Sequence, residues 1–242
     1  MAKSILLIHG AWHGSWCWKY VVPLLEKLDY TVIAIDLPGR NNNDMTPFKK
    51  INLATHVAYL RTVIQSLHTP VTLVGHSFAG IVMSQLAEAV PEVIDRLCYV
   101  SAFVPNMGCS LVDEIKQSTE DSIMKAVEIH LRNNEILLKK TAPIQTLFYN
   151  DCGSADGIFA LAHLQREAYR PFIEPLNVST ERFGKLKKMY IACANDHVIS
   201  LADQTRMSRQ HACQMITLGA DHSPFFSAPE ALVAAITNNE KN

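Results

Sequence analysis

The decapeptide Val71-Thr-Leu-Val-Gly-His-Ser-Phe-Ala-Gly80 decides the fold. Its first four residues are an apolar run typical of a buried strand, and the helix-period segment 78–89 follows Ser77 almost at once. A serine between a strand and a helix, with small residues two positions away on either side, is the nucleophile-elbow pattern G-x-S-x-G. Alanine replaces the second glycine here, and it is small enough for the turn. We therefore predict a nucleophilic Ser77, the alternative being a serine that only caps the helix.

Apolar runs and helix-period segments alternate on both sides of this decapeptide. The runs are apolar throughout, as strands buried on both faces should be. We expect strands at 4–8, 31–35, 71–74, 96–100, 188–193 and 214–218, and helices at 52–68, 78–89 and 229–236. This alternation predicts one α/β domain over 1–242, with a mostly parallel six-stranded sheet and helices on both faces.

The alternation stops over about 106–180 and then resumes. The part 113–138 is rich in helix-forming residues, and the stretch contains no run that we predict to be a buried strand. Because both flanks belong to one sheet, we expect a helical lid inserted into a single domain.

Composition excludes several classes of protein. The 242 residues include 22 Lys and Arg against 23 Asp and Glu, whereas a nucleic-acid surface needs a basic excess. No run reaches the roughly 18 apolar residues of a membrane helix, and the apolar stretch 5–8 is too short for a signal peptide. We therefore expect neither nucleic acid nor membrane as a partner.

The six cysteines are scattered without a CxxC pair, which argues against a metal site and against a disulfide framework. We expect reduced thiols in a cytoplasmic protein. The sequence does not set the oligomeric state, and a homodimer is one alternative.

A serine nucleophile needs a base, which in this architecture follows the acid near the end of the chain. Of the histidines beyond the insertion, His222 lies in a loop between the last strand and the last helix. His197 lies beside an acid candidate, and His211 lies in a polar helix. We predict His222 as the base, the alternative being a solvated loop histidine.

The acid should follow the penultimate strand, where it would fix the imidazole tautomer. Asp196 stands there, and Asp203 is the alternative further along, where a helix begins. Asp221 adjoins His222 and is badly placed to reach its Nδ1. We predict Asp196, which could instead be a turn aspartate that caps the next segment.

Two backbone N–H groups should bind the oxyanion. One belongs to Phe78, directly after the nucleophile, and the other should come from the loop after the first strand, where we choose Ala11. We expect His9 and His13 in that loop to hold the turn by hydrogen bonds.

These residues together resemble the α/β-hydrolase superfamily, and more narrowly the group of plant methylesterases of the salicylate-binding type, hydroxynitrile lyases and bacterial esterase relatives. The resemblance rests on Leu6-Leu-Ile-His-Gly-Ala-Trp-His-Gly-Ser-Trp-Cys-Trp18, Gly75 to Gly80, Glu181-Arg-Phe-Gly184 with Met189-Tyr-Ile-Ala-Cys193, and Gly219-Ala-Asp-His222. It implies a triad of Ser77, Asp196 and His222, no cofactor, and a small, largely enclosed, apolar pocket under the lid.

Three positions bear on the branch of this group. The lyases resemble one another in a threonine where this chain has Gly10, a lysine where it has Ser223, and an acidic residue where it has His76. Their absence favours ester hydrolysis. We expect a serine carboxylesterase for a small, largely apolar ester, the alternatives being a hydroxynitrile lyase-type enzyme and a non-catalytic small-ligand binding protein. The expected pocket residues, each of which could equally be plain core, are Gly10, Trp12, Phe78, Leu147, Phe148 and Phe159.

Overall fold

A computed structural model describes residues 3–40, 46–67, 70–118 and 122–238. Its centre is a six-stranded sheet in the order β2-β1-β3-β4-β8-β9, with every neighbouring pair parallel. The strands are β1 (Ser4–Ile8), β2 (Thr31–Ile35), β3 (Val71–His76), β4 (Ile94–Val100), β8 (Lys187–Cys193) and β9 (Gln214–Leu218). All six strands predicted from the sequence are present, and three have the predicted bounds.

Burial differs between the middle and the edges of the sheet. Strands β1, β3 and most of β4 and β8 are fully buried, as their continuous apolar runs predict. Strands β2 and β9 are the two edges, and most of their residues remain partly exposed. The expectation that every strand is buried on both faces is therefore wrong for these two, because each lacks a neighbour on one side.

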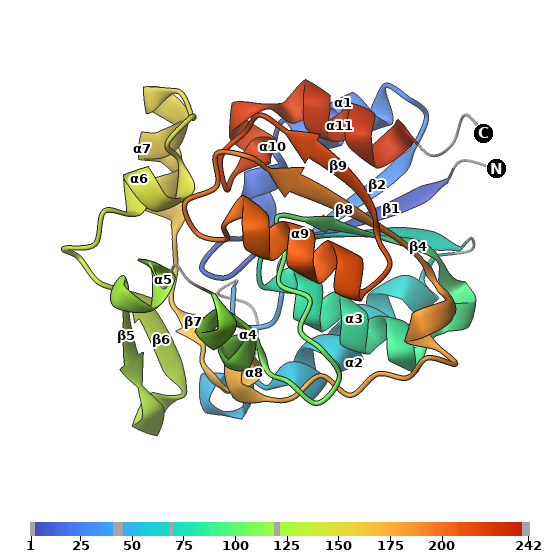
Figure 1. The fold of residues 1–242 in the computed structure, drawn as a ribbon, viewed down its shortest axis with the longest axis horizontal. Helices are drawn as coiled ribbons and strands as arrows, with labels where there is room; N and C mark the ends of the chain where they lie inside the picture. The colour runs from blue at the N-terminus through green and yellow to red at the C-terminus, as the bar shows by residue number, and fades with distance from the viewer. Residues whose placement is uncertain (1–2, 41–45, 68–69, 119–121, 239–242) are drawn as a thin grey trace.

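Helices cover both faces of the sheet (Figure 1). Helices α1 (Val21–Glu26) and α11 (Pro229–Thr237) lie on one side, while α2 (Leu53–Gln65) and α3 (Ala79–Ala89) pack together on the other. Helix α9 (Leu201–Gln210) packs on β8 and β9, and the short α10 (Pro224–Ser227) precedes α11. A capping box of Asn52 and Thr55 starts α2 where the sequence predicts a helix, and the predicted end at His68 lies outside the described residues.

Most of a long segment inserted between the hydrogen-bonded neighbours β4 and β8 lies beyond the carboxyl ends of the strands, and its last residues run back past α3 to the start of β8 (Figure 1). We call residues 101–186 the insertion. Its helices and strands are α4 (Leu111–Gln117), α5 (Ser122–Lys125), β5 (Val127–His130), β6 (Glu135–Leu138), α6 (Ile144–Phe148), α7 (Ser154–His163), β7 (Glu167–Ala168) and α8 (Arg170–Ile173).

The insertion contains a three-stranded antiparallel sheet, β5-β6-β7, which the sequence analysis did not predict. Its hairpin turns at Asn134, whose left-handed φ of 57° is one that asparagine tolerates. Apolar Val127 and Ile129 alternate with polar neighbours, as in a half-buried strand. The strands are four residues or fewer, so the helix formers around them obscure the pattern.

Among the helices in the described ranges, none is long and apolar enough to cross a membrane.

Candidate active site

Ser77 occupies a sharp turn between β3 and α3. Its φ is 52°, in the left-handed region that a residue with a side chain rarely adopts. The Ser77 N–H donates to the carbonyl of Val100 on the adjacent strand, and its carbonyl accepts from the N–H groups of Gly80 and Phe103. These bonds fix the strained turn and leave the hydroxyl at the carboxyl edge of the sheet, as the nucleophile-elbow pattern predicts.

Two glycines make this turn possible by their lack of a side chain. A Cβ atom on Gly75 would lie 2.6 Å from Sδ of Met83 and 3.2 Å from Cβ of Ala79. A Cβ on Gly80 would lie only 2.2 Å from the carbonyl oxygen of Phe103. The close approach of strand and helix therefore needs glycine at positions 75 and 80, while alanine fits at 79.

A chain of hydrogen bonds joins Ser77, His222 and Asp196. Nε2 of His222 lies 3.1 Å from Oγ of Ser77, and Nδ1 of the same ring lies 2.8 Å from Oδ2 of Asp196. The carboxylate accepts a hydrogen bond from the Nδ1–H group of His222. Nε2 of that ring is then unprotonated and can accept the serine proton. All three side chains are buried, so the structure brings together the three residues that the sequence singled out.

Asp196 is held so that only one of its oxygens faces the histidine. Oδ1 accepts the N–H groups of Val198 at 2.6 Å and Ile199 at 3.0 Å. Asp196 thus caps the turn with one oxygen, as the alternative predicts, while the other oxygen contacts His222. Ser101 donates a short hydrogen bond to Oδ2, and its Oγ lies 3.4 Å from Nδ1 of His222. Sequence reasoning missed Ser101, although a polar residue directly after β4 was a signal for it.

The other candidates for acid and base have structural partners elsewhere. Asp203 accepts from Ser118 and Ser200 and pairs with Arg206 within α9. The exposed His197 hydrogen-bonds the carbonyl of Thr146, and His211 hydrogen-bonds that of Val104. Asp221 accepts from Ser223, Ser227, Asp151 and Cys152, which fixes the loop that carries His222.

The loop after β1 places Ala11 at the cavity that Ser77 also lines. The Gly10 carbonyl accepts from Nδ1 of His9 at 2.8 Å and from the N–H of His13 at 3.3 Å. Because a trans peptide points its N–H away from its carbonyl, these bonds orient the Ala11 N–H. Within the described ranges, neither Ala11 nor Phe78 has a partner for its N–H, and both residues line the cavity at Ser77.

Three buried histidines surround His222 and its loops, and all are held neutral. Burial lowers the pKa of His13 to about 3 and lowers the pKa of His9 and His76 well below the ordinary value. His76 donates from Nε2 to the carbonyl of His222 at 2.7 Å, with the two ring centroids 4.7 Å apart. His76 thus positions His222 from the elbow itself, a contact that sequence reasoning missed. His9 and His13 hold the turn, as expected.

A cavity of about 20 Å³ lies over Ser77, room for little more than one water molecule. Most of its wall is apolar and comes from the insertion or from the ends of the core strands. The wall includes Trp12, Phe78, Phe103, Ile115, Phe148 and Phe172. Of the predicted pocket residues, Trp12, Phe78 and Phe148 therefore line it.

The other three predicted pocket residues do not line this cavity. Leu147, on α6, is buried in the core, and Phe159, on α7, packs against Trp16 and Phe226. Each helix turns its side chain away from the cavity. Gly10 lies behind Ser77, where an added Cβ would be 3.0 Å from Cβ of Ser77 and 2.6 Å from Nδ1 of His76.

Comparison with known proteins agrees with this geometry. Residues 5–235 match the alpha/beta hydrolase family. The chain belongs to the alpha/beta hydrolase family. It is 30% identical to putative methylesterase 11, chloroplastic, of Arabidopsis thaliana, over 95% of this chain and 62% of that protein. It is 27% identical to methylesterase 7 of the same plant, over 97% of this chain and 95% of the relative.

A solved structure of a pyrethroid hydrolase from Sphingobium faniae JZ-2 shares the fold, with a TM-score of 0.89 at 23% identity over 98% of this chain and 97% of the other. The chain spans about three-fifths or less of the length of the first curated relatives that it matches.

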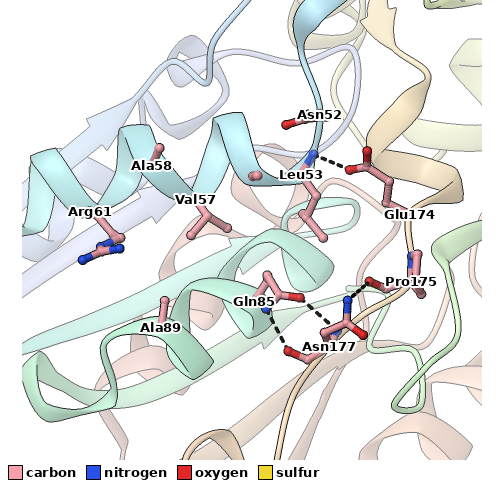
Figure 2. Close-up of a pocket in the computed structure, with 11 residues that line it drawn as sticks. Asn52, Leu53, Val57, Ala58, Arg61, Gln85, Ala89, Glu174, Pro175 and Asn177 are labelled. Carbon is pink, nitrogen blue, oxygen red and sulfur yellow. Dashed lines mark hydrogen bonds between the residues drawn. The ribbon is translucent and has the colours of Figure 1, made fainter.

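A wider groove of about 500 Å³ lies on the outer surface of this alpha/beta hydrolase, away from Ser77 (Figure 2). It lies between α2, α3 and the segment after α8, where Gln85 and Asn177 exchange two hydrogen bonds and Glu174 accepts the N–H of Leu53. These contacts fasten the end of the insertion to the core helices. The groove shares no lining residue with the cavity at Ser77, so its size does not make it the reaction site.

The six cysteines of this hydrolase are free, and burial raises the pKa of the Cys17, Cys152, Cys193 and Cys213 thiols. These four thiols are therefore poor nucleophiles at neutral pH.

Proposed function

We propose that this chain is a serine carboxylesterase that hydrolyses small, largely apolar esters. The observation that carries the proposal is the hydrogen-bond chain from Ser77 through His222 to Asp196, with Ser77 in a strained elbow under an apolar cavity. The 3.1 Å approach of Nε2 to the hydroxyl supplies the base that a serine nucleophile needs. Family membership and the methylesterase relatives support an esterase.

In the acylation step, Oγ of Ser77 attacks the ester carbonyl carbon while Nε2 of His222 takes the hydroxyl proton. The carbonyl oxygen becomes an oxyanion that the Ala11 and Phe78 N–H groups bind. Asp196 stabilises the imidazolium through Nδ1. The carbon–oxygen bond to the alcohol then breaks, and His222 gives its proton to the leaving alkoxide.

In the deacylation step, water attacks the acyl-enzyme carbonyl as His222 accepts one of the water protons. The same N–H pair binds the second oxyanion, and the Ser77 oxygen leaves with the proton from His222. The carboxylic acid is released and the resting state returns. Each oxyanion donor contributes about 2.7–4 kcal/mol of barrier lowering in such sites.

The substrate class follows from the wall of the cavity. Phe103, Ile115 and Phe172 present apolar surface to Ser77, so a charged acyl group would lose hydration without a partner. The small volume favours small groups, and the methylesterase names of the relatives favour a small alcohol.

Position 10 supports hydrolysis over cyanohydrin cleavage. The threonine of the lyases would place its Cβ 2.6 Å from Nδ1 of His76, which is itself held by the carbonyl of His222. A threonine at 10 and a histidine at 76 are therefore incompatible without a shift of the ring.

The first experiment compares initial rates on p-nitrophenyl acetate, butyrate and octanoate for the wild type and Ser77→Ala. We expect wild-type turnover, fastest on the shorter esters, and a kcat reduced by roughly 10⁶-fold in the variant. Equal rates in the two proteins would refute a serine esterase, and mandelonitrile cleavage without ester turnover would point to the lyase. Ligand binding without turnover of either substrate would favour a binding protein.

We also propose a cytoplasmic location and a homodimer. Size-exclusion chromatography with light scattering tests the second of them directly.

A further inference from the structure

Trp12, next to the proposed oxyanion donor, has a strained backbone that the insertion holds. Its φ is 62°, a left-handed value that is a genuine outlier for so bulky a residue. Three hydrogen bonds join it to the insertion. Its N–H donates to Oε2 of Glu167 at 3.3 Å, its carbonyl accepts the Gln165 N–H at 2.9 Å, and its indole Nε1 donates to the Ile136 carbonyl at 3.1 Å.

Glu167 is a buried carboxylate with a buried partner. It lies on β7, is 2% exposed, and forms a short ion pair with Arg40 from the core side of the fold. Arg40, itself 6% exposed, also donates a short hydrogen bond to the Arg166 carbonyl. A buried ion pair of this kind adds little to stability compared with apolar side chains of similar size. Stability alone therefore gives no reason for a carboxylate at this position.

The carboxylate acts on the peptide that follows the oxyanion donor. The Ala11–Trp12 peptide is held at both ends, because its N–H bonds Glu167 and its carbonyl accepts from Nδ1 of His13 at 2.8 Å. The preceding Gly10–Ala11 peptide carries the Ala11 N–H. Fixing the plane of the Ala11–Trp12 peptide on one side of the Ala11 Cα restricts how far the Gly10–Ala11 peptide on the other side can rotate.

We propose that Glu167 is a positioning residue that holds Trp12 in its left-handed conformation and thereby aims the Ala11 N–H at the oxyanion. The proposal rests on the proposed esterase function. It makes the oxyanion loop dependent on a strand of the insertion, with Arg40 holding the carboxylate in place.

Two double variants separate the hydrogen bond to Trp12 from the ion pair. Arg40→Met with Glu167→Leu removes the pair and also the acceptor of the Trp12 N–H. Arg40→Met with Glu167→Gln removes the same charges but keeps an amide oxygen that can accept from Trp12. Neither leaves a buried charge unpaired, the usual cause of misfolding when one partner is removed.

For the leucine variant we expect kcat to fall at least about 10-fold with KM within about 3-fold, since the loss of a whole oxyanion donor costs about 10²–10³ in kcat. Affinity for an alkyl trifluoromethyl ketone, whose serine adduct carries an oxyanion, should fall by the same factor as kcat/KM. Exchange of the Trp12 amide with deuterium should accelerate. The glutamine variant should recover most of each loss.

Wild-type kcat, ketone affinity and amide protection in a folded leucine variant would overturn the proposal. Equal losses in the two double variants would also overturn it, because they would trace the effect to the ion pair rather than to the bond with Trp12. If the wild type hydrolyses no ester, the proposed function fails first. Trp12 exchange in the two variants then decides by itself whether Glu167 holds the loop.

Discussion

The carboxyl edge of the sheet and the insertion above it contribute different things to one site. Ser77, Asp196 and His222 follow β3, β8 and β9, and backbone hydrogen bonds to neighbouring strands or loops fix their turns. The insertion contributes none of these three groups. It supplies apolar side chains such as Ile115 and Phe172 to the cavity, and it holds Trp12.

The difference shows which part of the molecule fixes the distances between these three groups. The strands that carry the reacting groups form one continuous parallel ladder, so the distances between those groups depend on the sheet as a whole. The insertion consists of short helices and a separate three-stranded sheet, so single side chains decide what it contacts. Changes at the sheet edge should therefore alter the rate, and changes to the apolar side chains that the insertion places on the cavity should alter the choice of substrate.

The largest expected effect tests the sheet side of this comparison. Asp196→Asn should fold normally and lose about 10⁴-fold in kcat, because an amide favours the wrong tautomer of His222. Asp203→Asn is the matched control, since it removes a carboxylate that accepts from Ser200 and pairs with Arg206 without contact to His222. Steady-state kinetics on p-nitrophenyl acetate checks both. A large loss in Asp203→Asn with an active Asp196→Asn would reverse the assignment of the acid.

Ile115→Ala and Leu147→Ala test the insertion side. Both residues are buried, so each change should cost about 2–5 kcal/mol of unfolding free energy. Only Ile115 lines the cavity, so only Ile115→Ala should raise the octanoate-to-acetate ratio of kcat/KM, by about 10-fold. Urea unfolding and the ester series measure the two effects separately. An equal shift in both variants would mean that general loosening of the insertion sets the preference.

Gly10→Ala tests how tightly the sheet edge is packed. The new Cβ would lie 2.6 Å from Nδ1 of His76, and moving that ring disturbs its bond to the His222 carbonyl. We expect a loss of about 1–3 kcal/mol in stability together with a reduced kcat. Gly219→Ala is the control, because an added Cβ there meets no atom within 4 Å. Thermal melts of the two variants should differ, and identical melts would show that His76 moves freely.

A further expected effect concerns pH and the buried histidines. His9, His13 and His76 have pKa values below the ordinary value of about 6.5 in the folded chain, that of His13 at about 3. As the pH falls, these histidines bind protons in the unfolded chain before they do so in the folded chain. The stability that the neutral histidines allow is therefore complete above pH 6.5 and is lost as the pH falls toward 3. Each can contribute a slope of up to about 1.4 kcal/mol per pH unit.

Urea unfolding between pH 7.5 and 4.5 measures this slope. His13→Gln should reduce the slope by the contribution of one titrating group, up to about 1.4 kcal/mol per pH unit. A slope unchanged by that substitution would show that His13 is not the group that titrates.

Strand order aside, the sheet and the placement of the three proposed reacting residues were predictable because their signals are local. A continuous apolar run predicts each strand, and Ser77, Asp196 and His222 each follow such a run directly. Ser101 follows one as well, but a serine in that place has many ordinary roles. The half-exposed state of β2 and β9 depends on their position in the sheet, which local pattern does not encode.

The insertion was not predictable in the same way. Strand β7 is two residues long, and the bond from Trp12 to Glu167 joins positions that lie far apart in the chain. Leu147 and Phe148 are adjacent apolar residues of α6, yet only Phe148 lines the cavity. Which of two neighbouring side chains faces Ser77 depends on how a short helix is docked, and that is decided by contacts with distant segments.

The place of the insertion between β4 and β8 has a consequence for protein engineering. Because β4 and β8 are parallel neighbours, the chain leaves the sheet at the carboxyl end of β4 and re-enters it at the amino end of β8. Both junctions thus adjoin one strand pair, and the other four strands contain neither. The insertion is in that sense a replaceable cassette. A transplanted cassette must fit more than the two junctions, however, since it also has to bring an acceptor and a donor for the backbone of Trp12.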